Sequence, residues 1–314
     1  MKIAALAGGT GAAKLLRGIA AVNDPAELTV IVNTADDWEC WGLRVSPDLD
    51  SVAYALAGRL NRELGWGLRG DTFRCLEAMA EFGEIPWFNL GDQDLATHIF
   101  RTKGIRQGQR LSAITDQIRR SLKLPTRLLP MTDDRVATRV RTPQGWLDFQ
   151  EYYVRERGQL EVLEVRYEGL ESAAPLPAAL AAIRQAELVL VCCSDPICSI
   201  GPIVSQEGFR QALLETPAPV VAVTPIVGNA MVAGPAAHFM RAKGYPVSCL
   251  GLAQWYGAWL DTLVIDRQDR AERAAIQALG IAVHEADVVM PDAAAEAALA
   301  REVIACAAHA KRTR

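Results

Sequence analysis

The sequence predicts an α/β fold: a Rossmann-like, mostly parallel sheet with helices on both faces and a small antiparallel insertion. Short, continuously apolar runs, such as residues 3–6 and 28–32, alternate with amphipathic helical patterns. Such runs are typical of strands buried on both faces of a parallel sheet. Residues 136–167 instead alternate between polar and apolar side chains, which favours antiparallel strands. We therefore expect residues 1–130 and 169–314 to form the Rossmann-like core and residues 131–168 to form the insertion.

The expected elements follow one another in a regular order. A strand at 3–6, a glycine turn at 8–11, an amphipathic helix and a strand at 28–32 form the first βαβ pattern. Helical patterns follow near 51–63, 71–82, 92–103 and 111–122. In the insertion, 136–142 and 146–154 are expected to be strands around the turn 143–145, with a third alternating stretch at 160–167. The second half predicts a helix at 177–186, strands at 188–191, 220–223, 248–253 and 262–266, and a closing helix at 292–308.

Charge and composition narrow the class of partner. Lys and Arg number 33 and Asp and Glu number 37, so the chain has no basic excess with which to neutralise a nucleic acid backbone. The longest stretch without charge, 216–240, is interrupted by prolines and glycines, so no membrane partner is expected. Seven cysteines without a CxxC pair do not suggest a disulfide framework or a zinc site. We therefore expect a cytoplasmic protein that acts on small molecules.

Four segments follow apolar runs and are rich in small and polar residues. They are residues 8–14, 33–37, 194–202 and 224–235. In an open parallel sheet the ligand crevice lies beyond the carboxyl ends of the strands. These segments are therefore expected to meet at one edge of the sheet and to form the functional site.

The glycine turn is a candidate phosphate site. Gly8, Gly9, Thr10 and Gly11 leave room for an anion near the start of the following helix, where N–H groups and the helix dipole favour negative charge. Lys14 is placed to reach the same anion. The turn does not match the dinucleotide fingerprint or the P-loop pattern, so a plain tight turn and a solvated lysine are the alternatives.

Acidic residues suggest a divalent cation. Asp36, Asp37, Asp48 and Asp50 follow the second expected strand, and Mg²⁺ prefers such oxygen ligands together with water and substrate phosphates. An acid after the second strand is also where a dinucleotide-binding fold reads a ribose, so an NAD(P)-dependent oxidoreductase is a competing hypothesis. Helix capping is the simplest alternative for any one of these acids.

Further along the chain, His98 could take part in proton transfer, although a lone histidine in a helix is more often structural. Phe149, Tyr152 and Tyr153 are expected to pack in the core, with stacking on a flat ligand or a dimer contact as alternatives.

Taken in order, nine segments of the chain resemble the 2-phospho-L-lactate transferase (CofD) family. These segments are 8–16, 32–37, 46–50, 70–73, 90–98, 129–133, 149–152, 199–203 and 264–266. The resemblance implies transfer of a phospholactyl-type group (2-phospholactate, phosphoenolpyruvate or phosphoglycerate) from a GDP-linked donor to the ribityl hydroxyl of the deazaflavin Fo. GMP is released and Mg²⁺ assists this step of coenzyme F-420 biosynthesis. A homodimer is also implied. The alternative is a CofD-like regulatory protein that binds a nucleotide sugar without catalysis.

The resemblance also implies roles for particular residues. Asp50 and Asp48 are the candidate catalytic residues: Asp50 corresponds to the acid that binds Fo, and Asp48 lies beside it to hold metal or orient the nucleophile. The metal is assigned to the group Asp36, Asp37, Asp48 and Asp50. Substrate binding is assigned to Asp50, Asn33, Thr34, Asn89, Asp92, Thr97 and His98. The nucleotide and its phosphates are assigned to Gly8, Gly9, Thr10, Gly11, Lys14, Ser194, Asp195, Pro196 and Ser199. Asn89 and Gln93 stand where the family often has arginine, and Cys192 to Pro196 depart from a Gly-Pro-Ser-Asn-Pro pattern, which leaves the identity of the donor acid open.

Overall fold

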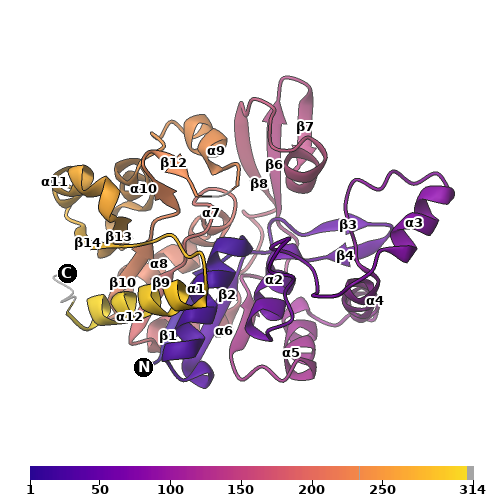
Figure 1. Cartoon of the computed structure of the whole chain (residues 1–314), viewed down its shortest axis with the longest axis horizontal. Helices are drawn as coiled ribbons and strands as arrows, with labels where there is room; N and C mark the ends of the chain where they lie inside the picture. Colours follow the sequence, from indigo (N-terminus) through magenta and orange to yellow (C-terminus); the bar gives the residue numbers. More distant parts are fainter. Residues whose placement is uncertain (233, 310–314) are drawn as a thin grey trace.

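A seven-stranded parallel sheet forms the centre of the molecule (Figure 1). The computed structural model describes residues 1–232 and 234–309, so Ala233, within the expected loop 224–235, and the C-terminal residues 310–314 lie outside the described residues. The spatial order of the strands is β14-β13-β10-β9-β1-β2-β5. Their bounds are β1 (Ile3–Ala7), β2 (Leu28–Val32), β5 (Arg127–Pro130), β9 (Leu188–Val191), β10 (Val220–Val223), β13 (Thr262–Asp266) and β14 (Ala282–Ala286). The predicted fold class is therefore confirmed; β14 was not predicted.

Helices cover both faces of the sheet. Successive strand residues point to opposite faces, so an apolar strand needs a packing partner on each side. Ile3 and Ala5 of β1 pack in one cluster with helices α1 (Gly9–Val22), α2 (Pro47–Leu56) and α12 (Ala293–His309). Ala4 and Leu6 pack in the other cluster, against α6 (Pro177–Gln185), α7 (Ile200–Val204), α8 (Glu207–Glu215), α9 (Ala236–Ala242) and α10 (Cys249–Tyr256). Figure 1 shows α1 and α12 side by side across one face. Both faces of the strands are thus buried, as their continuous apolar runs predict.

The order in which successive strands are added to the parallel sheet reverses at β1. From β1 the chain proceeds to β2 and β5 on one side, and it later returns to place β9 on the other side of β1. Ile3 is level with Leu28 of β2 and with Leu188 of β9, so the three strands end at the same height. This reversal is the topological switch point at which open α/β sheets bind ligands.

The insertion contains a separate antiparallel sheet, with one correction to the expected strands. The sheet has the order β7-β6-β8, with β6 (Ala137–Thr142), β7 (Gly145–Asp148) and β8 (Glu164–Glu168). The prediction of a strand through 154 is wrong, because Glu151–Arg155 forms a π-helix. The Glu151 carboxylate accepts a hydrogen bond from the Asp148 N–H (3.0 Å) at the end of β7. Phe149 and Tyr152, three positions apart as on a helix, both pack against Phe239.

Other elements also differ from the sequence prediction. Residues 248–253 are helical rather than extended, because Ser248 caps α10 by accepting a hydrogen bond from the Gly251 N–H (3.1 Å). Two hairpins were not predicted: β3 (Trp38–Cys40) with β4 (Leu43–Val45), and β11 (Ile226–Val227) with β12 (Ala230–Met231). The remaining helices are α3 (Arg74–Glu81), α4 (Asp92–Arg106), α5 (Leu111–Ser121) and α11 (Arg273–Gln277), and the short 3-10 turns are Pro25–Glu27, Gly257–Trp259 and Arg267–Glu272.

Candidate functional site

A cavity of about 820 Å³ opens at the carboxyl edge of the sheet, beside the ends of β1, β2, β9 and β10. All four of the segments expected to meet there contribute to its walls. The predicted site residues that line it are Gly8, Gly9, Thr10, Gly11, Lys14, Asp36, Asp48, Asp50, Asn89, His98, Ser194, Asp195 and Ser199. The predicted convergence of the glycine turn with the acids after β2 is therefore observed.

The glycine turn holds one of these acids in place. The Gly9 N–H donates a hydrogen bond to Asp48 Oδ1 (2.7 Å), and Gly9 has a φ of 72°, which glycine adopts without strain. At Gly8 a Cβ atom would lie 2.5 Å from Asp48 Oδ2, so no larger residue fits there. The Gly8 N–H donates to Ser194 Oγ (3.1 Å). The turn thus fixes Asp48 at the N-terminus of α1, where the helix dipole favours an anion.

Asn33 binds two acids together from behind the cavity wall. Its Nδ2 group donates to Asp36 Oδ2 (3.1 Å) and to Asp48 Oδ2 (3.0 Å), while its Oδ1 accepts from the Ala35 N–H (2.9 Å). The side chain is fully buried and does not line the cavity. Asn33 therefore orients Asp36 and Asp48 rather than facing the cavity itself.

Asp36, Asp48 and Asp195 are carboxylates for which the described residues supply no ion-pair partner. Asp36 Oδ1 and Asp195 Oδ2 are buried and accept no hydrogen bond within the described part of the chain. Burial, with the nearby Asp48 charge, raises the pKa of Asp36 well above its usual value. Burial also raises the pKa of Asp48 and of Asp195 to about 6, although hydrogen bonds from neighbouring groups oppose this rise. Such a site is suited to an added cation, which would offset the cost of burying these charges.

The other two predicted acids already have cationic partners. Asp37 accepts a hydrogen bond from Ser46 Oγ (2.6 Å) and lies 3.3 Å from the Arg44 guanidinium, and it does not line the cavity. Asp50 accepts two hydrogen bonds from Arg101, one of them 3.0 Å between Nη1 and Oδ2. Arg101 is 1% exposed, so the pair with Asp50 is a buried, bidentate ion pair.

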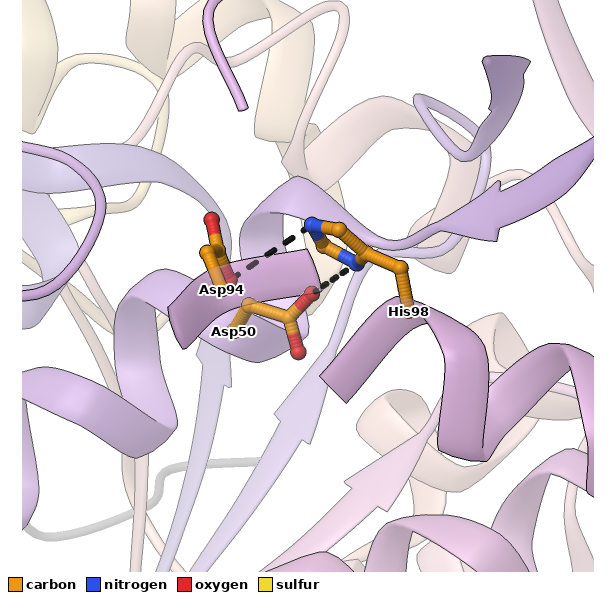
Figure 2. A group of neighbouring side chains, drawn as sticks. All are labelled: Asp50, Asp94 and His98. Atoms are coloured by element: carbon orange, nitrogen blue, oxygen red, sulfur yellow. Dashed lines mark ion pairs between the residues drawn. The ribbon is translucent and has the colours of Figure 1, made fainter. Parts of the chain in front are cut away.

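Figure 2 shows His98 between two acids, Asp50 from α2 and Asp94 from α4. His98 Nδ1 lies 3.7 Å from Asp50 Oδ2, and Nε2 lies 3.5 Å from Asp94 Oδ1. Arg101 Nη1 is 3.3 Å from Nδ1 and can only donate, so Nδ1 is the acceptor and the Nε2–H faces Asp94. Tyr54 donates to Asp94 Oδ1 (2.7 Å). These side chains form one buried polar network in the wall of the cavity, with Arg101 behind them.

This network is a poor site for Mg²⁺ although its geometry is compact. Ligand atoms of Asp50, Asp94 and His98 lie within 4.8 Å of one another. However, Arg101 already supplies a positive charge to Asp50, and Mg²⁺ prefers oxygen ligands to an imidazole nitrogen. The acids without cationic partners, Asp36 and Asp48, fit Mg²⁺ better.

Comparison with known proteins identifies the family. A family model described as 2-phospho-L-lactate transferase CofD matches residues 3–308. The chain belongs to the CofD family. It is 41% identical to a 2-phospho-L-lactate transferase of Methanosarcina acetivorans, over 95% of this chain and 97% of that protein. It is also 41% identical to a phosphoenolpyruvate transferase of Streptomyces coelicolor, over 98% of each chain. A crystal structure of a UPF0052-family protein from Bacillus halodurans shares the fold, with a TM-score of 0.65, 14% identity and coverage of 96% of this chain and 98% of that one.

Some residues predicted from the CofD resemblance lie outside the cavity. They are Asn33, Thr34, Asp37, Asp92, Thr97 and Pro196. Asp92 accepts hydrogen bonds from the N–H groups of Arg74 and Cys75 at the start of α3. Thr97 Oγ1 lies 2.7 Å from the Tyr54 hydroxyl. The observed contacts of these two residues are structural: Asp92 caps a helix, and Thr97 supports the buried network.

Residues in and behind the cavity wall of this CofD chain were missed or only partly predicted. Arg101 was missed, although it lies three positions after His98 and seven after Asp94, a spacing that places all three on one helix face. Phe149 and Tyr153 line the cavity and stack with ring centroids 5.7 Å apart. Tyr152 is fully buried, as expected for a core residue. The alternating polar and apolar pattern does not separate the two tyrosines.

The replacement Asp195→Asn is expected to change the pH dependence of stability. The pKa of Asp195 is raised from 3.8 to about 6 by burial, so its contribution to folding is present below pH 4 and is lost as the pH rises through 6. Asparagine keeps an oxygen for the Ile197 and Cys198 N–H groups, which donate to Asp195 Oδ1 at 2.8 and 2.9 Å, and removes the charge. Between pH 4.5 and pH 7, the variant should gain about 2 kcal/mol of unfolding free energy relative to the wild type.

Urea unfolding of both proteins at the two pH values, without divalent cations, measures this gain. Parallel stability profiles for the wild type and Asp195→Asn would show that Asp195 does not carry a buried charge.

Proposed function

We propose that this CofD-family chain is a transferase of F-420 biosynthesis. The ribityl hydroxyl of Fo attacks the phosphorus atom adjacent to the acid in a guanylylated phospho-acid, in which the phosphate of the phospho-acid is joined to GMP. The new bond joins the Fo oxygen to that phosphorus, the phosphoanhydride bond breaks, GMP leaves and the hydroxyl proton is released. The observation that carries the proposal is the cavity at the switch point, where the glycine turn meets buried acids that lack cations. Curated relatives at about 40% identity are named as transferases of this type.

We place Mg²⁺ at Asp36 and Asp48. These carboxylates are held together by one amide, that of Asn33, and Asp36 Oδ1 has no hydrogen-bond partner among the described residues. Asp195 faces the same cavity with a buried oxygen that accepts no hydrogen bond from the described residues. When bound, the metal supplies positive charge to the diphosphate oxygens. Asp37 and Asp50 are less suited to this role because Arg44 and Arg101 neutralise them.

The chain's own residues bind and orient the two substrates. Transfer of a phosphorus group depends mainly on alignment of the attacking hydroxyl and on electrostatic stabilisation. Lys14 lines the cavity beside the glycine turn, and its ammonium is anchored by the Met290 carbonyl (3.1 Å). On another wall, the stacked rings of Phe149 and Tyr153 offer a flat apolar surface that suits the deazaflavin ring.

The donor acid is the open specificity question. Relatives named for 2-phospholactate and for phosphoenolpyruvate are equally similar, at 41% identity.

Within the described residues no helix combines the length and apolar character of a membrane span. The homodimer and the cytoplasmic location stay predictions.

Direct reaction tests this proposal. Purified protein is mixed with Fo and, separately, guanylylated 2-phospholactate, phosphoenolpyruvate or phosphoglycerate, with Mg²⁺ or with EDTA. We expect one donor at least to give an Fo phosphodiester and one equivalent of GMP by mass spectrometry, and we expect EDTA to stop the reaction until Mg²⁺ is restored. Binding of Fo or guanine nucleotide without product from any donor would instead favour the non-catalytic, regulatory alternative.

A further inference from the structure

One cation on the cavity wall has no partner among the described residues. The charged side chains that line the cavity include five aspartates but only two strong bases, Lys14 and Arg157. Lys14 donates to the Met290 carbonyl. The Arg157 side chain is exposed and makes no hydrogen bond or ion pair with the part of the chain that the structure describes. A free guanidinium in a wall whose charged residues are mostly acids points to an anionic group of the ligand.

The backbone presents Arg157 in a conformation that arginine rarely adopts. Its φ is 55°, and it is the one cavity-lining residue among the four described non-glycine residues with positive φ. Tyr152 holds the turn, because the Gly158 N–H donates to the Tyr152 carbonyl (2.9 Å) and the Tyr152 hydroxyl lies 3.1 Å from the Gly158 carbonyl. Tyr152 is fully buried. An unfavourable conformation that the core imposes on a cavity residue is a reason to look for a functional role.

A second arginine on the same turn provides the contrast. Arg155, two positions earlier, donates to Glu151 (2.9 Å) and to Glu156 (3.1 Å) and lies over the Trp87 ring at 5.6 Å. It does not line the cavity. Of these two neighbouring arginines, one is neutralised by its surroundings and the other, Arg157, is left for a ligand.

We propose that Arg157 binds the carboxylate of the acid carried by the donor, and so selects donors that have one. This inference rests on the proposed function. The donor has two anionic parts, the diphosphate and the carboxylate. The diphosphate belongs near the glycine turn, Lys14 and the metal-binding acids, which lie at the sheet edge. Arg157 lies in the insertion, on the wall that also carries Phe149 and Tyr153. A guanidinium matches a planar carboxylate with two parallel hydrogen bonds, which an ammonium does not.

The test compares two donors on three variants. Each GDP-linked donor is prepared with its carboxylate and with a carboxamide in its place, and Arg157→Gln, Arg157→Lys and the control Arg155→Gln are compared with the wild type. For the carboxylate donor we expect Arg157→Gln to lower kcat/KM roughly 10- to 100-fold, the range for one charge-assisted interaction. Arg157→Lys should fall in between. For the carboxamide donor we expect less than about a threefold change.

Binding of the same donors, measured by calorimetry without Fo, separates this proposal from the proposed function. A carboxylate-dependent loss of affinity in Arg157→Gln but not in Arg155→Gln supports the role of Arg157, even if no transfer to Fo occurs. Equal losses with both donors would overturn it, since Arg157 would then act on the phosphates or on the fold. No loss with either donor, or the same loss in Arg155→Gln, would also overturn it.

Discussion

Asp48→Asn is expected to lower kcat by about a thousandfold while the chain stays folded. Loss of a group that holds a metal or aligns the reacting atoms removes roughly 3–4 kcal/mol of transition-state stabilisation. Asp48 is held between hydrogen bonds from the Gly9 N–H and the Asn33 amide. Asparagine has nearly the same volume but no negative charge, so the cation at Asp36 would lose its second carboxylate.

Steady-state turnover with Fo and the best donor, over a range of Mg²⁺ concentrations, measures this effect. We expect both a lower kcat and a higher Mg²⁺ concentration at half-maximal rate. Asp116→Asn is the matched control, because Asp116 is half-exposed and pairs with Arg119 and Arg120 outside the cavity. The thermal unfolding temperature of Asp116→Asn should be close to that of the wild type, and that of Asp48→Asn should be no lower, because burial raises the pKa of Asp48 and asparagine removes the buried charge. Activity of Asp48→Asn within tenfold of the wild type would contradict the assignment of Asp48 to the metal site.

Much of this site could be predicted because it follows from the connection of parallel strands. The carboxyl ends of β1, β2 and β9 must lie at one edge once those strands pair in parallel, so the segments after them converge. The glycine turn and the acids after β2 could therefore be assigned to one place without coordinates. Even Asp195, far along the chain, was assigned to this edge by the same argument.

The division of the acids into two groups could not be predicted. Asp36 and Asp48 lack cationic partners, whereas Asp37 and Asp50 have them. That difference depends on Arg44, carried by a hairpin that no sequence pattern indicated, and on Arg101, which is 51 residues from Asp50. Local propensity carries no information about such pairings. The same holds for Arg157, whose exposure to the cavity depends on a π-helix that replaced an expected strand.

Arg101→Met is expected to destabilise the protein by about 3–5 kcal/mol, the largest stability effect that we predict. Methionine preserves much of the volume but leaves Asp50 buried, 5% exposed, without its guanidinium partner. The carboxylate of Asp94 belongs to the same network and adds a second negative charge nearby. Urea unfolding at pH 7 measures the loss. Arg120→Met is the control: its pair with Asp116 is a surface pair, with Arg120 73% exposed, and should be worth at most about 1 kcal/mol.

A double variant tests whether the unpaired charge causes this loss. In Asp50→Asn with Arg101→Met the uncompensated carboxylate is absent, so more than half of the lost stability should return. Failure of the second substitution to restore stability would show that Arg101 acts by packing rather than by neutralising Asp50. The same reasoning governs how activity data on Asp50 are interpreted, because Asp50→Ala leaves Arg101 as a buried, unpaired cation. Loss of turnover in Asp50→Ala therefore indicates a catalytic role only if the free energy of unfolding of this variant is unchanged. Asp48→Asn needs no such condition, because Asp48 has no cationic partner among the described residues that the substitution would leave unpaired.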